Sequence, residues 1–349
     1  MKKEHILIIR FSALGDVAMA VPVVYSLAMT YPHVRITVLS RGFARPFFED
    51  LAPNVSFMEA DIKGEYRGIK GLNALYRRLV AKKPTAVADF HGVLRSTYLR
   101  MRFNMERFRV EHINKHRSGK RALTSSSDKR MVQQPTSFDN YAEVLARLGY
   151  PVKLQFSSIF GNEGGDLSLL PAAIGKRNEG EQWIGIAPFA AHKGKVYPPE
   201  MMERVIDLIE ENNPHCRIFL FGRGRDESHT FPEWCARHSH CIFVGEHLDT
   251  MRQELVLMSH LDVMVSMDSA NMHMASLTGT PVVSVWGATH PYAGFMGWNQ
   301  SEDNAVQLDL PCRPCSIFGN KPCRRGDFAC MNGIKPEQIY DKINRLLSH

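Results

Sequence analysis

Residues 262–290 read DVMVSMDSANMHMASLTGTPVVSVWGATH, and this stretch decides the fold. Apolar, largely β-branched runs at 263–265 and 282–286 predict two strands. Residues 271–277 between them predict a helix, which ends at Gly279. A strand, a helix and a strand in this order form a parallel crossover unit, because parallel neighbours cannot be joined by a tight turn. The stretch therefore predicts an α/β protein with a parallel sheet.

Polar residues follow the first of these strands, where the chain enters the helix. Asp268 and Ser269 lie at this point, and His273 follows one turn later. In parallel sheets, ligands bind beyond the carboxyl ends of the strands, often at a helix N-terminus whose free N–H groups favour phosphate. The alternative is that Asp268 and Ser269 only cap the helix. The pattern alone leaves both interpretations open.

Composition and charge narrow the class of protein and its partners. The chain has 349 residues, 44% of them hydrophobic and 23% charged, which indicates a globular protein of about two domains. Lys and Arg number 43 against 36 Asp and Glu, a net charge of +7 that favours an anionic partner. The sequence carries no nucleic-acid-binding signature, so we expect no nucleic acid partner. It also has neither a signal peptide nor 18 consecutive apolar residues, and we expect a cytoplasmic protein.

Strands and helices alternate along the whole chain, which predicts doubly wound parallel sheets. Besides the two strands above, we expect strands at residues 5–10, 34–39, 55–60, 85–89, 183–188, 217–222 and 241–245. Pro22 lies in the helix after the first strand, so this helix either bends there or begins near Val21.

The alternation of strands and helices is interrupted twice, and these interruptions divide the chain into domains. Residues 112–137 are polar and basic and predict an exposed, mobile loop. A stretch rich in Gly, Glu and Asn, residues 161–181, predicts a linker. We therefore expect domains at 1–165 and 180–333, followed by a helix at 334–349 that is able to pack back on the first domain.

Four cysteines near the C-terminus have the spacing CxxC-x7-C-x6-C. They are Cys312, Cys315, Cys323 and Cys330. This spacing can provide a tetrahedral Zn site. Two alternatives are a loop of reduced cysteines and an oxidation-prone cluster, because the second pair is loosely spaced.

The loop after the first strand, RFSALGDV, contains the carboxylate Asp16. At the carboxyl edge of a sheet, a single carboxylate can act as a general base that deprotonates a substrate hydroxyl. It can equally cap the following helix. The residues alone do not separate these two roles.

Four motifs in order resemble the lipopolysaccharide heptosyltransferase family, glycosyltransferase family 9. They are RFSALGDVAMAVPVVYSL (10–27), KVYP (195–198), FGRGRDE (221–227) and SMDSANMHMASLTGTPVVSVWGATHP (266–291). The resemblance extends from Ile6 to about Met331. It implies the GT-B fold, in which two Rossmann-like domains face each other across a cleft. The N-terminal domain would bind the acceptor and the C-terminal domain the nucleotide-sugar.

The resemblance also assigns roles to individual residues. Asp16 matches the catalytic base, and Lys195 matches a lysine that neutralises the donor diphosphate. The other donor-binding matches are Asp268 for the sugar hydroxyls, Ser269 and Ala270 for phosphate through their backbone N–H groups, His273 in the same signature, and Asp226 or Glu227 for the ribose. His273 has the alternative of simply packing on its helix face. The sequence departs from the family at Ala190 and Ala191, where hydroxyls are usual, and at Ala270, where glycine is usual.

The implied reaction is an inverting transfer of heptose from ADP-heptose to a hydroxyl of a lipopolysaccharide core. It requires no cofactor or metal, because the ADP-sugar is a substrate and Lys195 with the helix N-terminus can neutralise the leaving diphosphate. Two rivals remain. One is a GT-B transferase or epimerase that uses another nucleotide-sugar, and the other is a non-catalytic nucleotide-binding module.

The implied acceptor, a lipid A core, is anionic. Basic residues that could meet it are Arg67, Lys70, Arg95, Arg117, Lys120 and Arg121. Arginine favours bidentate contacts with carboxylate or phosphate. For each of these residues the alternative is a solvated surface position. As a set they also suggest peripheral contact with the cytoplasmic face of the inner membrane.

Overall fold

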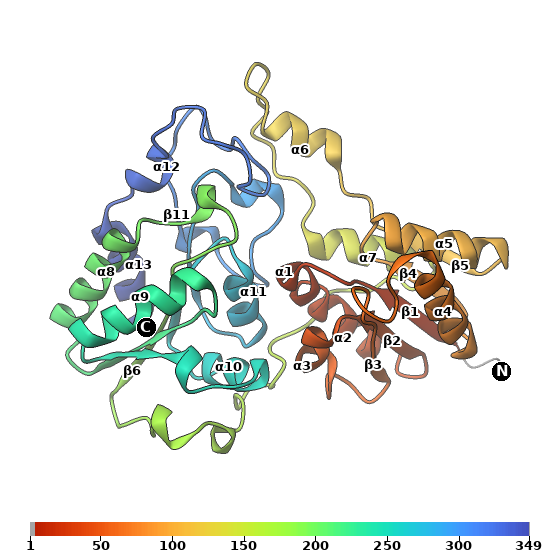
Figure 1. Cartoon of the computed structure of the whole chain (residues 1–349), viewed down its shortest axis with the longest axis horizontal. Coiled ribbons are helices and arrows are strands. Elements are labelled where there is room, and N and C mark those ends of the chain that lie inside the picture. Colours follow the sequence, from red (N-terminus) through yellow and green to blue (C-terminus); the bar gives the residue numbers. More distant parts are fainter. Residues whose placement is uncertain (1–3, 349) are drawn as a thin grey trace. The chain divides into compact units, whose positions relative to one another are not determined.

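A computed structural model describes residues 4–348, which form two compact units. The first unit comprises the chain up to Lys115 together with Pro135–Ile159. The second comprises His116–Gln134 and the chain from Phe160 onwards. Each unit contains its own parallel sheet with helices packed around it (Figure 1).

The first unit has five parallel strands in the order β3-β2-β1-β4-β5. These are β1 (His5–Ile9), β2 (Arg35–Ser40), β3 (Val55–Glu59), β4 (Ala86–Asp89) and β5 (Arg109–His112). Its helices are α1 (Leu14–Ala18), α2 (Val21–Thr30), α3 (Arg45–Phe48), α4 (Gly68–Ala81), α5 (Leu94–Met105) and α7 (Ser137–Arg147). Strand β1 is central and fully buried, as parallel strands covered on both faces are.

The four strands predicted in this unit are confirmed, but β5 and the preceding α5 were not predicted. Strand β5 reads RVEH and is only partly buried, so it lacks the apolar run that marks a central strand. Helix α2 begins at Val21 and places Pro22 in its first turn, where the missing N–H would have no partner within the helix. Of the two alternatives for Pro22, the helix start is therefore the observed one.

The second unit has six parallel strands in the order β11-β10-β9-β6-β7-β8. These are β6 (Gln182–Ala187), β7 (Cys216–Leu220), β8 (Cys241–Phe243), β9 (Val263–Met267), β10 (Val282–Val285) and β11 (Ala305–Val306). Its helices are α6 (Arg117–Leu123), α8 (Pro199–Asn212), α9 (Arg225–Arg237), α10 (Met251–Met258), α11 (Ala270–Leu277), α12 (Ala329–Asn332) and α13 (Pro336–Leu347). The crossover unit predicted from residues 262–290 is β9-α11-β10 and is confirmed.

The basic stretch predicted as an exposed loop differs most from expectation. It holds α6, and residues 116–134 group with the second unit. The backbone N–H of Gln134 donates to the carbonyl of Tyr292 at 2.9 Å. The ammonium of Lys129 donates to the carbonyl of Arg313 at 2.8 Å. Because these partners lie more than 150 residues further along the chain, local sequence gives no sign of them.

The predicted linker also groups with the second unit. From Phe160 the chain belongs to that unit, and the N–H of Gly165 donates to the Ser259 hydroxyl at 2.8 Å. The Gly- and Glu-rich composition reflects short turns, among them Leu167–Leu169 and Ala172–Ile174. The observed boundaries between units therefore fall at residues 115, 134 and 159 instead of within 166–179.

The C-terminal helix α13 packs within the second unit, against α8, β9 and β10. Ile339 and Ile343 are one turn apart, fully buried, and part of that unit's hydrophobic core. These contacts lie inside the second unit, and packing of this helix on the first domain stays a prediction. Within residues 4–348, no helix combines the length and the apolar character needed to span a bilayer.

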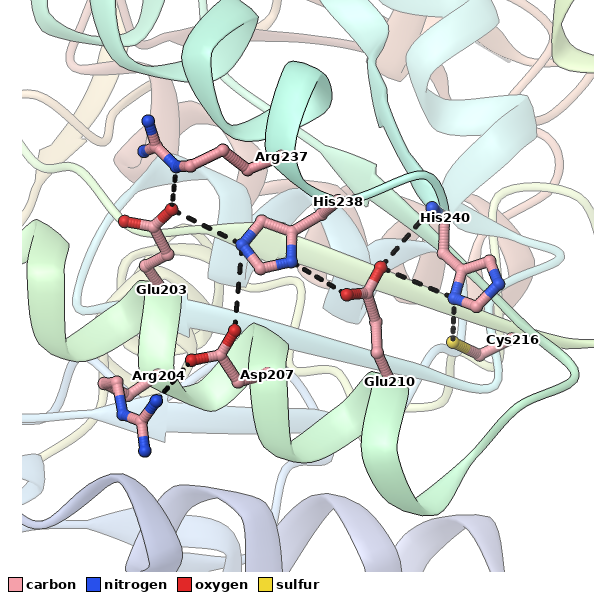
Figure 2. A network of polar contacts seen from close by, with 8 residues as sticks. All are labelled: Glu203, Arg204, Asp207, Glu210, Cys216, Arg237, His238 and His240. Atoms are coloured by element: carbon pink, nitrogen blue, oxygen red, sulfur yellow. Dashed lines mark hydrogen bonds and ion pairs between the residues drawn. The ribbon is translucent and has the colours of Figure 1, made fainter.

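A buried histidine joins α9 to α8 in the second unit (Figure 2). His238 follows α9, and its side chain is only 7% exposed. Its Nδ1 lies 2.8 Å from a carboxylate oxygen of Glu210, and its Nε2 lies 3.4 Å from Glu203. Arg237 donates to the same Glu203 oxygen at 2.6 Å. Asp207 Oδ1 also lies 3.9 Å from Nε2, so three carboxylates surround one buried imidazole and this contact depends on their ionisation.

We predict that Glu203→Gln destabilises the protein at neutral pH but not at low pH. Burial works to raise the pKa of Glu203, but hydrogen bonds from Arg237 and His238 hold it below its ordinary value of 4.5. A lowered pKa stabilises the fold above the ordinary value, and this stabilisation is lost as pH falls through the folded-state pKa. Urea unfolding should show a deficit of about 1 kcal/mol at pH 7 that shrinks below pH 4.

The control is Glu233→Gln, which removes an exposed carboxylate 4.0 Å from the same Arg237. It should change stability by less than about 0.5 kcal/mol, since exposed ion pairs contribute little. A deficit for Glu203→Gln that stayed constant from pH 7 to pH 3.5 would contradict the prediction.

Candidate active site

In the first unit, a buried arginine holds Asp16 at the carboxyl end of β1. Arg10 follows β1, its side chain is 7% exposed, and its guanidinium lies 2.6 Å from Asp16 Oδ2. It also donates to the carbonyl of Phe90 at 2.7 Å. The hydroxyl of Tyr141 in turn donates to the backbone carbonyl of Asp16 at 3.1 Å. Arg10 therefore holds the carboxylate of Asp16, and Tyr141 holds the backbone of the same residue.

The two oxygens of the Asp16 carboxylate have different environments. Oδ2 is paired with Arg10 and also accepts a hydrogen bond from the backbone N–H of Ala13 at 3.2 Å, so the predicted capping role is present. Within residues 4–348, Oδ1 has no hydrogen-bond partner, and the side chain is 33% exposed. An oxygen that is held in place and accessible can accept a proton from a bound hydroxyl. Capping and general-base roles are thus compatible in one side chain.

His91 supports the loop that carries Asp16. The N–H of Phe11 donates to His91 Nδ1 at 3.4 Å, and Nε2 lies 3.5 Å from the Ser12 hydroxyl. Burial and the nearby charge of Arg10 lower the pKa of His91 to about 3, so the ring is neutral at physiological pH. It therefore orients the loop without adding a second positive charge beside Arg10.

The sequence patterns did not predict Arg10, His91 and Tyr141 as parts of this site. One signal was present: Arg10 interrupts an apolar run and stays buried, and a buried charge requires a partner. His91 follows β4 at the same edge of the sheet. Tyr141 lies 125 residues beyond Asp16, and no local pattern links the two.

In the second unit, Lys195 and Asp268 form an ion pair. Lys195 Nζ lies 3.2 Å from Asp268 Oδ2, and the two side chains are 15% and 5% exposed. Lys195 closes a short turn (Lys193–Lys195) beyond β6, and Asp268 directly follows β9. Since β6 and β9 are paired neighbours, the two residues meet at the carboxyl edge of this sheet.

The N-terminus of α11 lies at the same edge. Ser269 is its N-cap residue, but within residues 4–348 its hydroxyl makes no capping hydrogen bond and lies 3.2 Å from that of Ser266. The predicted side-chain cap by Ser269 is therefore not formed, and the helix can offer its N–H groups to an anion. Ala270 is the first residue of the helix, where a Cβ causes no strain.

Glu227 is better placed than Asp226 to meet a ligand at this edge. Both lie in the first turn of α9, but Asp226 is exposed and Glu227 is half-buried. The Glu227 carboxylate folds over Gly222 and Gly224, which leave room for it because they lack a Cβ. This carboxylate follows β7, the other neighbour of β6.

The remaining donor-side residues have simpler surroundings. His273 is buried in α11, as its packing alternative expected, and this burial is equally compatible with its place in the family signature. Ala190 packs against the hydrophobic core of the second unit, where a hydroxyl would be less favourable. Ala191 is exposed.

The six basic acceptor candidates do not belong to one unit. Arg67, Lys70 and Arg95 lie at the starts of α4 and α5 in the first unit and are exposed. The other three lie on α6 in the second unit, namely Arg117, Lys120 and Arg121. Their assignment to a single N-terminal domain is corrected, because residues 116–134 group with the second unit.

The four C-terminal cysteines line one pocket, together with Arg313 and Phe328. However, no group of three or more His, Cys, Asp or Glu side chains in residues 4–348 is arranged to hold a metal ion. Burial raises the pKa of Cys330 to about 11 and also raises that of Cys315. In contrast, backbone hydrogen bonds hold the pKa of Cys323 below its ordinary value despite the opposing effect of burial, so the four thiols do not share one ionisation tendency. The arrangement gives the Zn hypothesis no support beyond the shared pocket.

Solved structures with the same architecture establish the fold class. One is a family 9 glycosyl transferase from Veillonella parvula, with 18% identity and a TM-score of 0.74 over 100% of this chain and 98% of that chain. Another is the E. coli heptosyltransferase WaaC with ADP, with 15% identity and a TM-score of 0.70 over 98% and 99%. The predicted GT-B fold is confirmed.

The sequence itself identifies the family. The model of glycosyltransferase family 9 (heptosyltransferase) matches residues 72–322, more than half of the chain, so the chain belongs to this family. A curated relative, lipooligosaccharide heptosyltransferase 2 from Campylobacter jejuni, is 29% identical over 85 residues, which are 24% of this chain. The chain spans about a quarter of the length of the first such relatives it matches.

We predict that the His91 ring stays neutral between pH 8 and pH 5. Its pKa of about 3 follows from burial and from the adjacent Arg10. In a histidine-labelled sample, the His91 resonances assigned by comparison with His91→Gln should not shift over this range. A midpoint above pH 5 for His91 would contradict the described packing.

Proposed function

We propose that this protein is an inverting glycosyltransferase that moves heptose from ADP-heptose to a hydroxyl of an anionic lipopolysaccharide core. The observation that carries the proposal is the Asp16 carboxylate, which is held through Oδ2 in a side chain that is 33% exposed. Membership of glycosyltransferase family 9 supports the reaction class. The ADP in the WaaC structure and the lipooligosaccharide in the name of the Campylobacter relative support the donor and the acceptor.

In the proposed step, Asp16 Oδ1 accepts the proton of the acceptor hydroxyl. The hydroxyl oxygen forms a bond to the anomeric carbon while the bond from that carbon to the diphosphate oxygen breaks. ADP leaves with the electron pair on the opposite face, so the configuration inverts in one displacement. Arg10 is a positioning residue in this step, because it fixes the carboxylate through the other oxygen.

The second unit provides the groups that we propose for the donor. Lys195 and the N–H groups of α11 would meet the diphosphate and stabilise the charge that gathers on it. Asp268 would accept hydrogen bonds from sugar hydroxyls, and Glu227 from the ribose. These groups supply the positive charge that a metal would otherwise bring, so the proposal requires neither a metal nor a cofactor.

On the acceptor side, we propose that Arg67, Lys70 and Arg95 meet acidic or phosphorylated sugars. They lie at the N-terminal ends of α4 and α5. In a parallel sheet with crossover helices, these ends lie at the carboxyl edge of the strands. Asp16 follows β1 at that same edge of the first unit. The basic groups are therefore suited to an anionic acceptor near the base.

We predict that Asp16→Asn lowers kcat about 10²–10⁴-fold, the usual contribution of a general base, and leaves ADP affinity unchanged. The amide keeps the size of the side chain and can still accept from Arg10, so the fold should persist. Turnover would be followed by ADP release, and ADP binding by calorimetry. Glu49→Gln, at an exposed carboxylate, is the control. Wild-type kcat in Asp16→Asn would overturn the proposed base.

We predict that Lys195→Met weakens ADP binding about 10–100-fold. It removes a charged hydrogen bond and leaves the buried Asp268 carboxylate unpaired beside the incoming phosphates. The matched control is Lys193→Met, two residues away on the same turn but exposed. It should change ADP affinity by less than about threefold, in line with an exposed charge.

The same calorimetry, run with ADP, UDP and GDP, separates the proposed donor from its rivals. Preference for UDP or GDP would contradict an ADP-sugar donor and favour another transferase or an epimerase. Tight ADP binding with no transfer from ADP-heptose by the wild-type protein would favour a nucleotide-binding module.

A further inference from the structure

A loop of the second unit lies against the side chain of Lys195. We call residues 307–328, which connect β11 to α12, the β11–α12 loop. It includes three of the four C-terminal cysteines. Its backbone passes the lysine at Gly319, where an added Cβ would lie 2.4 Å from Lys195 Cγ and 2.7 Å from Cδ. Since carbon atoms in contact are about 3.5–4.0 Å apart, any side chain at this position would take the space of the lysine stem.

The Lys195 stem has fixed points at both ends. Its backbone N–H donates to the carbonyl of His192 at 2.9 Å, within the turn that follows β6. Its Nζ lies 3.2 Å from Asp268 Oδ2. Cγ and Cδ lie between these points, so they cannot move away from Gly319 without displacing the ammonium or the turn. The glycine therefore determines the path that the lysine side chain follows to the carboxyl edge of the sheet.

Backbone hydrogen bonds connect the loop to the turn that carries the lysine. The N–H groups of Cys315 and Ser316 both donate to the carbonyl of Ala288, at 3.1 and 3.2 Å. The N–H of Ala288 in turn donates to the carbonyl of Gly194, at 2.9 Å. Gly194 directly precedes Lys195 in the sequence. The loop thus reaches the lysine at its backbone as well as at its stem.

A buried arginine anchors the loop to the edge of the sheet. Arg313 is only 5% exposed. Its guanidinium donates to three backbone carbonyls that follow β10, those of Trp286, Gly287 and Thr289. Strand β10 pairs with β9, whose carboxyl end carries Asp268. Because a buried charge requires hydrogen-bond partners, Arg313 fixes the loop relative to this edge.

We propose that the β11–α12 loop positions Lys195 for the donor diphosphate, and that Gly319 is the positioning residue. The inference rests on the proposed function, in which the Lys195 ammonium meets the phosphates. A lysine side chain is a compact charge on a flexible stem, and it loses rotational freedom when it binds. A stem that is already held beside a fixed backbone loses less freedom, which strengthens binding. Glycine suits this position twice, because it lacks a Cβ and because its φ is +74°.

The test is the affinity for ADP, measured by calorimetry on the full chain with Gly319→Ala. The added methyl group displaces the lysine stem, so we expect the dissociation constant to rise about three- to tenfold, part of the loss expected for removing the charge. The matched control is Gly326→Ala in the same loop. Gly326 has a φ of +82°, and an added Cβ would have no atom of residues 4–348 within 4 Å. Both variants carry the same kind of backbone strain, but Gly326→Ala should keep ADP affinity within about twofold.

A double variant separates positioning of the lysine from a general effect on the donor site. Lys195→Met keeps an unbranched, flexible stem but removes the charge. If Gly319 acts through the ammonium, Gly319→Ala should change ADP affinity by less than about twofold in the Lys195→Met background. A distortion of the site that does not involve the ammonium would weaken ADP binding equally in both backgrounds.

A second variant loosens the loop without adding an atom beside the lysine. The Ser316 hydroxyl donates to Asn320 Oδ1 at 3.1 Å and closes the segment that contains Gly319. Ser316→Ala removes this hydrogen bond, and Asn320 is exposed, so water can replace the lost partner. ADP affinity should fall about two- to fivefold, in line with the loss of one hydrogen bond, and the effect should again vanish with Lys195→Met.

The two proposals fail on different results. Wild-type ADP affinity in a folded Gly319→Ala protein would overturn the positioning role. An equal effect of Gly326→Ala, or an undiminished effect of Gly319→Ala in the Lys195→Met background, would also overturn it. If circular dichroism showed that Gly319→Ala does not fold, wild-type affinity in Ser316→Ala would do so. By contrast, a Lys195→Met protein that binds ADP like the wild type would contradict the role of Lys195 in the proposed function itself.

Discussion

Both sheets are entirely parallel, and this constraint determines where chemistry is possible. Each strand must be followed by a crossover, so the loops after the strands collect at one edge of the sheet. In the first unit, this edge holds Asp16 and His91, which follow β1 and β4. In the second, it holds Lys195, Glu227 and Asp268, which follow β6, β7 and β9. Residues far apart in sequence become neighbours because the strands before them are neighbours.

Both groups depend on a charge that is buried beside its partner. Arg10 is paired with Asp16, and Lys195 with Asp268. A buried ion pair gains little stability over apolar packing, because desolvation of two charges offsets their attraction. Such pairs are better explained by the orientation that they impose on each other's side chains. Arg10 contacts Oδ2 of the Asp16 carboxylate, and in the proposed function Lys195 would exchange the Asp268 carboxylate for a phosphate.

The sequence predicted the parts of this arrangement that depend on short-range patterns. The apolar runs gave the central strands, and residues 262–290 gave the β9-α11-β10 unit with Asp268 and Ser269 at its turn. It did not predict β5, which is short and partly exposed. Resemblance to a family located Asp16 and Lys195, whereas the support of Asp16 by Tyr141 became visible only when the chain was folded.

Short-range patterns also could not predict the structure of the basic stretch between β5 and α7. Its composition is typical of a solvated loop, and its actual partners, including Tyr292 and Arg313, come near the end of the chain. For the four cysteines, in contrast, the sequence pattern predicts more than the structure supports. Their spacing permits a metal site, but their side chains in residues 4–348 are not arranged as a group that could hold a metal ion.

The assignment of residues 116–134 to the second unit has a consequence for biosynthesis. The first unit needs α7, whose Phe138, Tyr141 and Val144 are buried, and α7 is translated only after α6. The first sheet can therefore emerge from the ribosome before the helix that completes its cover. The partners of the stretch that holds α6, including Tyr292 and Arg313, are translated only about 150 residues later. Neither half can be obtained by cutting the chain once, and each is expected to mature late in synthesis.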